Sequence, residues 1–352
     1  MLNTDALARL ACPVDGSEQL SSRIFRGEPD AIVDAVIVCE ACRAWFPVED
    51  GIPDFLIGEL AYADDRARFW QRHETELAKL RLAPDTPRGS GETDLQRTQQ
   101  RHFDWYSRNE KQTYDEYERL PFWVAADGIA FSRWRSLIRP RTWLLDVGCG
   151  PGRATAKLID LDIDILAFDV SKAMVRLAAD RFRSPGALAR TVFMAADAMR
   201  FPVRSASLDY VMAYGVLHHV PDPPRVCREI DRVLQPSGLY LGSENSTSVF
   251  RGLFELLQKI RPQWYEEAGP EALFSARGLD ESFAGTNMAL STRTSVFLPP
   301  HLLNQLSARA AAAVLNATDR IGGAIPFLRD NGGLILVEGT KSLSEPVGPQ
   351  AR

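Results

Sequence analysis

The chain has 352 residues, of which 45% are hydrophobic and 25% are charged. This composition can bury a full core and excludes a disordered or collagen-like chain, and the length suits two domains, or one large domain with additions. The 41 basic and 46 acidic residues leave a net charge of -5, which excludes a globally basic surface that wraps nucleic acid.

The first residues, MLNTDALARLACPVDG, have neither the basic start nor the long apolar stretch of a secretory signal. No uncharged apolar run approaches the roughly 20 residues that cross a bilayer. We therefore expect a cytoplasmic protein with no membrane span. Five cysteines, an odd number, favour a metal site or free thiols over a disulfide framework.

Residues 1–60 are expected to form a small β-rich module with a net charge of -7, from 11 acidic residues and 4 arginines. Two pairs, Cys12 with Asp15 and Cys39 with Cys42, have the two-knuckle spacing of a zinc ribbon, with Asp15 in place of one thiolate. Zinc accepts carboxylate oxygen, so this donor set is chemically permissible. The alternative is a ribbon that has lost its metal.

Residues 61–140 are expected to be a helical linker or lid, because DDRARFWQRHETELAKL and RTQQRHFDWYSRNEKQTYDEYERL have helical spacing. The intervening PDTPRGSGETD reads as an exposed linker. Aromatic residues of this segment either cover a cofactor and substrate or pack in the core and between domains. They are Phe103, Trp105, Tyr106, Tyr114, Tyr117, Phe122 and Trp123.

From residue 141 to 342, apolar β-runs alternate with helical stretches, which predicts an α/β fold with a doubly wound sheet. The first runs are WLLDVG, DILAFDV, VFMAAD, LDYVMAY and LYLGSEN. Two later strands, MALSTRTSVFL and GGLILVEGT, flank a long helix expected over about 301–321. That helix either packs between the strands or faces a homodimer partner or a membrane surface. Residues 343–352 are expected to be a flexible tail.

A glycine loop, LLDVGCGPGR, joins the first of these strands to the next helix. Glycines at 148, 150 and 152 let the backbone turn tightly and approach a ligand closely. Taken alone, such a run also fits an ordinary strand-to-helix turn.

Acidic residues lie at the ends of the first three strands, and together they predict a crevice that fits an adenosine. Asp169, 23 residues after Asp146, can accept both hydroxyls of a ribose, and Asp197 comes near the position of an adenine. Any one of them alone could instead cap a helix. The loop lacks a P-loop lysine, and Asp146 would repel pyrophosphate but attract an ammonium group. An adenosine that carries an amino acid therefore fits better than a dinucleotide.

Residues 140–245 resemble the class I S-adenosylmethionine-dependent methyltransferases, especially the branch with the quinone-biosynthesis enzymes. The matching segments are LLDVGCGPGR, FDVSKAMV, AADAMRFP and LDYVMAYGVLHHVPDPPRVCREIDRVLQPSGLYL, with QPSG as the one departure. The resemblance implies a Rossmann-like seven-stranded sheet that binds S-adenosylmethionine and releases S-adenosylhomocysteine. It assigns the methionine moiety to Asp146 and the loop Gly148, Cys149, Gly150 and Gly152, the ribose to Asp169, and the adenine to Val170, Met174, Asp197 and Ala198.

Candidates for the chemistry follow the fourth and fifth strands: Tyr214, His218, His219, Glu244 and Asn245. A histidine can take a proton from the acceptor near neutral pH, and we favour His218. The LHHV segment recurs in the family with diverse substrates, so packing or cofactor-lining roles stay open for both histidines. Phe103 and Tyr106 are expected at the cofactor, because similar enzymes place an aromatic about forty residues before the glycine loop.

Residues 7–57, approximately, resemble the small zinc-ribbon proteins that activate transfer-RNA methyltransferases, and the zinc domain of some ribosomal-RNA methyltransferases. LACPVDG and VCEACRAWFPVEDGIPDFL carry this resemblance, and Asp15 departs from it. In those proteins the module binds RNA or a partner subunit. A net charge of -7 argues against phosphate binding, so we expect a scaffold that packs on the catalytic domain.

The leading interpretation is an enzyme that methylates an oxygen, nitrogen or carbon of a small molecule: a secondary metabolite, a quinone-like compound or a lipid-linked acceptor. Residues 246–287 are expected to shape the acceptor pocket. One alternative is an RNA methyltransferase, which the ribbon suggests and the charge opposes. Another is a non-catalytic protein that binds S-adenosylmethionine and a partner.

Overall fold

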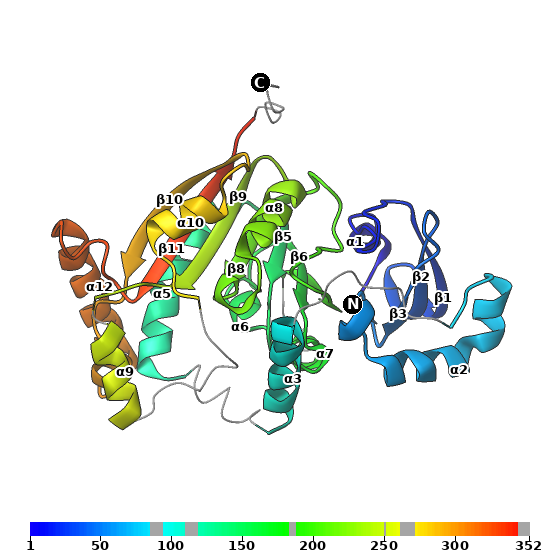
Figure 1. The fold of residues 1–352 in the computed structure, drawn as a ribbon, viewed down its shortest axis with the longest axis horizontal. Helices are drawn as coiled ribbons and strands as arrows, with labels where there is room; N and C mark the ends of the chain where they lie inside the picture. Colours follow the sequence, from blue (N-terminus) through cyan, green and yellow to red (C-terminus); the bar gives the residue numbers. More distant parts are fainter. Residues whose placement is uncertain (85–93, 110–118, 183–187, 250, 261–271, 344–352) are drawn as a thin grey trace.

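The computed structural model describes residues 1–84, 94–109, 119–182, 188–249, 251–260 and 272–343 (Figure 1). The expected linker over 84–94 and the tail over 343–352 therefore lie almost wholly outside the described residues, as do Tyr114 and Tyr117.

The amino-terminal module is an antiparallel sheet, as predicted. Its strands β1 (Leu20–Glu28), β2 (Ala31–Cys39), β3 (Trp45–Glu49) and β4 (Ile52–Pro53) are adjacent in chain order within the described residues, after the short helix α1 (Thr4–Leu7). A 3-10 turn, η1 (Gly58–Leu60), and helix α2 (Ala63–Lys79) lead out of the module. Trp45, Phe69 and Leu77 are buried between the sheet and α2.

The larger sheet has seven strands in the described part of the chain, in the order β10-β11-β9-β8-β5-β6-β7. Strands β5 (Trp143–Val147), β6 (Asp164–Asp169), β7 (Arg190–Ala195), β8 (Leu208–Tyr214) and β9 (Leu234–Asn245) are parallel. Strand β11 (Leu334–Lys341) is antiparallel to β9 and to β10 (Met288–Ser295). This is the α/β Rossmann-like seven-stranded sheet that the sequence predicts.

Helices cover both faces of this sheet, because its strands bury side chains alternately on the two sides. One face holds α5 (Pro121–Leu137), α6 (Arg153–Ala156), α7 (Lys172–Arg181), α11 (Pro300–Leu303) and α12 (Ala308–Ala324). The other holds α8 (Pro223–Val233), α10 (Ala276–Ser282) and the module. Two further helices, α3 (Asp94–Asn109) and α9 (Arg251–Ile260), lie toward the lower side of the view in Figure 1.

The module docks against β7, the edge strand of the large sheet. The Phe55 amide donates to the Ala195 carbonyl over 2.8 Å, and Leu10 forms a bridge with Val203. Module residues such as Phe55 share one buried cluster with Phe168 of β6 and Phe201. Pairing and apolar contact therefore cover an edge that would otherwise be open.

The long helix expected over 301–321 is instead two helices, α11 and α12. The backbone of Ser307 is extended, and its hydroxyl accepts from the Ala310 amide over 3.3 Å, so a new helix begins there. Ala311 and Leu315 of α12 are buried with α5, which favours the packing interpretation over a partner or membrane face. A homodimer stays a prediction.

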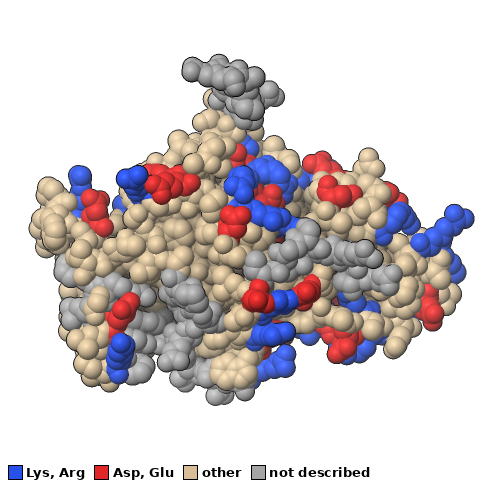
Figure 2. All heavy atoms as spheres, viewed as in Figure 1, with Lys and Arg blue, Asp and Glu red and all other residues tan. Residues whose placement is uncertain are grey.

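Among the described residues, no helix is both long and apolar enough to cross a membrane. The cytoplasmic location stays a prediction. On the face of the molecule in Figure 2, basic side chains lie next to acidic ones, and no broad basic area is visible.

Candidate functional site

A cavity of about 370 Å³ opens at the carboxyl ends of the parallel strands, beneath α3 and the start of α5. Its wall includes most of the residues that the sequence singled out for cofactor and chemistry. These are Phe103, Tyr106, Gly148, Cys149, Gly150, Asp169, Val170, Met174, Asp197, Ala198, Tyr214, His218, His219, Glu244 and Asn245.

The glycine loop forms the floor of this cavity. Gly150 has a φ of +51°, and a Cβ built there meets no atom within 4 Å, so its position faces open space. At Gly148, with a φ of +63°, a Cβ would lie 2.8 Å from Val216. Gly152 faces Phe182 of the protein interior instead and does not line the cavity. The loop thus offers bare backbone to a ligand, which is the cradle that an adenosylated amino acid needs.

Asp169 ends β6 and is held by backbone amides. Its Oδ2 accepts from the Gly150 amide over 2.9 Å and its Oδ1 from the Ser171 amide over 2.8 Å. Burial raises the pKa of this carboxyl to about 6, and the Asp104 carboxylate adds to the rise. A pair of ribose hydroxyls that donate to the carboxylate would stabilise its ionised form.

Asp146 differs from the role expected of it. Its side chain is buried behind the loop rather than on the cavity wall, and its Oδ2 accepts from the Thr155 hydroxyl over 2.5 Å. Burial raises its pKa to about 7. The strand points this side chain back toward α6, so in this structure it fixes the loop and does not itself face a ligand.

Asp197 lies two residues beyond β7, on the cavity wall. Its Oδ1 accepts from the Met199 amide over 2.9 Å, and its Oδ2 accepts from the Gln96 amide group over 2.8 Å. Burial raises the pKa of this carboxyl. The position suits an adenine, whose exocyclic amine is a hydrogen-bond donor.

His218 and Glu244 form a buried pair on the wall. His218 Nδ1 lies 2.7 Å from Glu244 Oε2, while Glu244 Oε1 accepts from the Val216 and Leu217 amides over 3.1 and 2.8 Å. A carboxylate that already accepts two amides favours the tautomer whose proton is on Nδ1. Nε2 is then the proton acceptor.

His219 is a different kind of group. Burial, with the neighbouring His218 and His102, lowers its pKa well below the usual 6.5, so it is neutral. Its ring makes an edge contact with Phe103 at 5.6 Å between centroids, and among the described residues its Nδ1 has no hydrogen-bond partner. This placement fits wall packing better than proton transfer.

Helix α3 supplies site residues that the sequence analysis did not single out. Gln96, Gln100 and Asp104 lie four residues apart and reach the loops that follow β6 and β7. Gln96 contacts Asp197, as above; Gln100 donates to the Val170 and Leu60 carbonyls over 3.2 and 2.8 Å. Asp104 accepts the Ser171 hydroxyl over 2.6 Å. The four-residue spacing shows that these polar residues share one face of a helix. The sequence does not show which part of the protein that face contacts.

A second missed group surrounds Arg153, the residue after the glycine loop. Its guanidinium pairs with Asp127 of α5 and lies over the Trp123 and Tyr214 rings, 4.6 and 5.5 Å from their centroids. Tyr214 donates to Asp127 over 2.8 Å, and burial raises the tyrosine pKa well above 10. Tyr214 therefore stays protonated on the cavity wall, and its catalytic role stays a prediction. A carboxylate within the apolar stretch PFWVAADGIAF was the overlooked signal.

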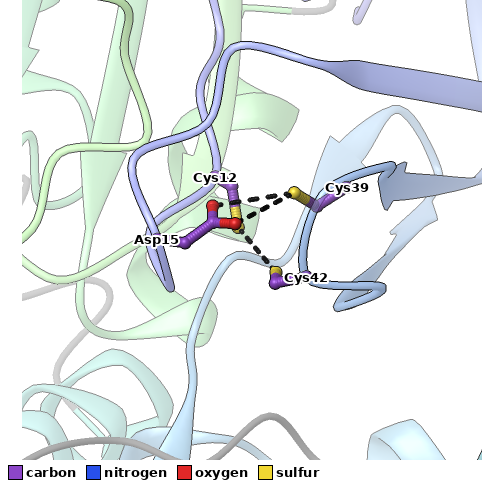
Figure 3. Close-up of side chains that lie close together, drawn as sticks. All are labelled: Cys12, Asp15, Cys39 and Cys42. Carbon is purple, nitrogen blue, oxygen red and sulfur yellow. Dashed lines mark hydrogen bonds between the residues drawn. The ribbon is translucent and has the colours of Figure 1, made fainter.

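The four predicted metal ligands come together in the amino-terminal module (Figure 3). One ligand atom from each of Cys12, Asp15, Cys39 and Cys42 lies within 4.8 Å of all the others. The Cys12 and Cys42 sulfurs are 3.6 Å apart, close to the roughly 3.7 Å edge of a tetrahedron with Zn–S bonds of about 2.3 Å. Cys39 Sγ lies 3.6 Å from Asp15 Oδ1. This donor set fits a tetrahedral zinc ion.

Comparison with known proteins agrees with this geometry. Residues 145–242 match the family model of a methyltransferase domain. A segment of 96 residues is 40% identical to 27-O-demethylrifamycin SV methyltransferase of Amycolatopsis mediterranei, over 27% of this chain and 35% of the relative. It is also 40% identical to methyltransferase GfsG of Streptomyces halstedii, over 27% and 34%. The chain thus spans about a third of the length of these curated relatives.

Solved structures that resemble the chain include a SAM-dependent methyltransferase from Thermotoga maritima, 17% identical with a TM-score of 0.47, over 68% of this chain and 99% of that one. The [4+2]-cyclase SpnF is 24% identical with a TM-score of 0.44, over 62% and 82%. Residues 145–242 are thus similar to a methyltransferase domain, and they lie within the seven-stranded sheet.

Proposed function

We propose that the chain transfers the methyl group of S-adenosylmethionine to a nucleophile of a small-molecule acceptor. One observation carries this: the Asp169 and Asp197 carboxylates, the glycine loop and the His218–Glu244 pair share one cavity. The residues proposed to bind adenosine and the proposed proton acceptor, His218, therefore line the same cavity. In-line methyl transfer requires such proximity of the cofactor and the nucleophile.

The cofactor-binding roles follow the chemistry of the wall. Asp169 accepts the ribose hydroxyls, Asp197 and the Ala198 amide receive the adenine edge, and Val170 and Met174 pack on its ring. Phe103 and Tyr106 of α3 cover the site and exclude water, and an aromatic face also attracts a sulfonium. S-adenosylmethionine, when bound, supplies an electrophilic methyl group at the end of the loop Gly148–Gly150.

His218 takes the proton of an acceptor hydroxyl or amine at Nε2. Glu244 acts as a positioning residue, because it holds the Nδ1 proton and stabilises the imidazolium that forms. Both side chains are largely buried in the cavity wall. His219 and Tyr214 shape the wall.

The acceptor class we propose is a hydroxyl-bearing secondary metabolite. The support is the name of the 40% identical relative, which acts at an oxygen of a rifamycin. Around the acceptor end the wall is largely aromatic and apolar, with Phe122, Trp123, Pro300 and Leu334. A quinone-like or lipid-linked acceptor fits the same apolar wall.

The module, which we place at residues 1–60, is proposed to be a zinc-bound scaffold. Residues 61–140 connect it to the methyltransferase domain over 141–342. Zinc would hold Cys12 and Asp15 against the Cys39–Cys42 hairpin, and the module in turn covers the β7 edge. Elemental analysis of the purified protein should give about one zinc per chain.

Calorimetry with S-adenosylhomocysteine, followed by transfer of labelled methyl groups to a panel of acceptors, tests the function. The panel contains 27-O-demethylrifamycin SV, hydroquinones and RNA. Asp169→Ala should lose about 1 to 3 kcal/mol of binding free energy, because charge-assisted hydrogen bonds disappear. Asp160→Ala is the matched control, since that carboxylate is exposed and pairs with Arg135.

Each result separates the competing functions. Label on a small molecule supports the proposal, and label on RNA at low salt favours the RNA methyltransferase. Binding of S-adenosylhomocysteine without transfer to any acceptor favours the non-catalytic protein. Absence of binding contradicts the cofactor site itself.

A further inference from the structure

Two consecutive histidines of the 3-10 turn η2 (Leu217–His219) line the same cavity but have different surroundings. The centroids of the His218 and His219 rings are 4.0 Å apart, and their planes are tilted by 44°. His218 Nδ1 has the Glu244 carboxylate as its partner, at 2.7 Å. His219 Nδ1 is buried and has no hydrogen-bond partner in the part of the chain that the structure describes. The two rings therefore differ in which nitrogen can carry a proton.

The surroundings of His219 determine its tautomer. Burial, with the neighbouring His218 and His102, lowers its pKa well below 6.5, so the ring is neutral and has a single N–H group. A proton on Nδ1 would be a buried donor without an acceptor, and such orphaned N–H groups are rare because they lose a hydrogen bond to water. The proton is therefore on Nε2. Since the ring lines the cavity while its Nδ1 is buried, the edge with Nε2 is the one that can reach a ligand.

His218 has the opposite arrangement. Its proton is on Nδ1, which donates to Glu244, so its Nε2 is a hydrogen-bond acceptor. Glu244 is occupied by this ring and by the Val216 and Leu217 amides, and no hydrogen bond joins it to His219. Consecutive residues of one turn thus offer an acceptor and a donor, each at Nε2.

The sheet places this pair on the acceptor side of the cavity. Turn η2 follows β8, whereas the glycine loop follows β5, and the strand order is β9-β8-β5-β6-β7. Asp169 and Asp197, the proposed adenosine ligands, follow β6 and β7 on the other side of the loop. Phe103 of α3 lies against the His219 ring, with the centroids 5.6 Å apart. His219 is therefore separated from the adenosine end by the loop and is held in place by an aromatic contact.

We infer that His219 determines acceptor specificity: its Nε2 donates to an oxygen next to the hydroxyl that is methylated. This inference rests on the proposed function, in which His218 takes the proton of that hydroxyl. Rings with centroids 4.0 Å apart suit two oxygens on adjacent carbons, as in a catechol, a vicinal diol or a hydroxy-ketone. An acceptor with a lone hydroxyl would leave the His219 donor unpaired, and a hydrogen-bonding site rejects a ligand in this way.

The tautomers can be measured without any acceptor. Nitrogen NMR of protein with isotope-labelled histidines reports which ring nitrogen carries the proton. At pH 7, His219 should carry its proton on Nε2 and His218 on Nδ1. Spectra of His219→Gln and His218→Gln, each of which lacks one set of signals, assign the two rings. A His219 ring that is charged, or that carries its proton on Nδ1, overturns the inference.

Two isomeric probes test the specificity. Catechol and hydroquinone have the same two hydroxyls, which are on adjacent carbons only in catechol. Calorimetry measures their affinity for protein saturated with S-adenosylhomocysteine, so no turnover is needed. Wild-type protein should bind catechol about 5- to 100-fold more tightly than hydroquinone.

Variants at one position separate the donor from the ring. His219→Phe keeps an aromatic ring against Phe103 but has no donor, so it should reduce the preference to less than about 2-fold. His219→Gln has an N–H donor near the position of Nε2 and should retain most of the preference. His73→Phe is the matched control, because that ring stacks on Phe25 of β1, apart from the cavity. Binding of S-adenosylhomocysteine should be nearly equal in all four proteins.

Contrary results are distinct. A preference for catechol that survives His219→Phe overturns the inference. So does wild-type protein that binds S-adenosylhomocysteine but does not prefer catechol, or binds neither isomer, whether or not the variants fold. Weaker binding of S-adenosylhomocysteine by folded His219→Phe also overturns it and assigns the ring to the cofactor. Failure of wild-type protein to bind S-adenosylhomocysteine contradicts the proposed function instead.

Discussion

The Lys172 ammonium lies 3.2 Å from the Asp54 carboxylate, and this buried ion pair joins α7 to the amino-terminal module. Asp65 and Glu49 lie 2.9 and 3.6 Å from the same nitrogen. The Lys172 amide donates to the Tyr62 hydroxyl, which in turn donates to Asp104 of α3. The module, the lid helix and the loop that carries Asp169 are thus parts of one polar network.

Removal of the Lys172 ammonium should lower the free energy of unfolding of the protein. Lys172→Met leaves three carboxylates facing one another in a buried place, and the loss of one partner of a buried pair costs about 3 to 5 kcal/mol. We expect a matching drop in the free energy of unfolding in urea. Arg176→Met is the control, because that guanidinium is 55% exposed and lies 3.7 Å from Asp65. Equal effects of the two substitutions would contradict the network.

Helix α3 should matter for cofactor affinity even where it does not touch the ligand. Gln100→Leu keeps the size of the side chain and leaves the Val170 and Leu60 carbonyls without their donor. Because Val170 adjoins Asp169, we expect S-adenosylhomocysteine to bind about 3- to 10-fold more weakly, within the usual cost of an unpaired buried group. Arg101→Leu, on the exposed side of the same helix, should leave calorimetric affinity unchanged.

Cofactor binding should strengthen as the pH rises from 5 to 7. Burial raises the pKa of Asp169 to about 6 in the ligand-free protein, above its ordinary 3.8. The stability that this group contributes is therefore fully present below pH 3.8 and is lost as the pH rises through 6. Ribose hydroxyls donate to the ionised carboxylate, so binding favours the form present above pH 6.

Calorimetry with S-adenosylhomocysteine at pH 5, 6, 7 and 8 measures this linkage. Below about pH 6 the affinity should fall by up to roughly tenfold per pH unit, as expected when binding releases one proton. Asp169→Asn cannot ionise, so its affinity should be lower and should lose the step near pH 6. A wild-type profile that is flat over the range would argue against ionised Asp169 as the ribose acceptor.

Much of this site could be predicted from the sequence, because the residues at the end of a strand can be recognised from the few residues around them. A buried strand, a glycine turn and an acid at the next strand end determine where Asp169 and Asp197 lie once the sheet forms. The direction of a side chain just before a tight turn depends on the packing around that turn. Asp146, which was expected at the ligand, points to Thr155 behind the loop in the structure. Arg153 pairs with Asp127 of α5, and Gln100 of α3 donates to Leu60 of η1. These elements come together only when the chain folds, so the sequence alone did not predict these contacts.

Glu244→Gln should abolish most of the methyl transfer and spare cofactor binding. The glutamine carbonyl can still accept the Val216 and Leu217 amides, while its amide group donates to His218 Nδ1 and moves the histidine proton to Nε2. Nε2 then has no lone pair for the acceptor proton, and general-base assistance is worth about 100-fold or more in rate. Affinity for S-adenosylhomocysteine should stay within about threefold.

His218→Ala should give a similar rate, and a double variant should be no worse than either single one. Additive losses would mean that the two residues act separately.

Asp15→Cys should tighten the metal site, because thiolate is a softer and stronger zinc donor than carboxylate. The ligand atoms already lie within 4.8 Å of one another, so the new sulfur needs little rearrangement. We expect zinc to be released to a competing chelator more slowly from this variant than from wild-type protein, and Cys42→Ser to release it faster.

Cys227→Ser is the control, since that buried thiol lies in α8, apart from the cluster. Each release is followed by a chromogenic zinc indicator, and the melting temperature recorded alongside should fall as zinc leaves. A melting temperature that does not respond to metal removal would contradict a structural role for the ion.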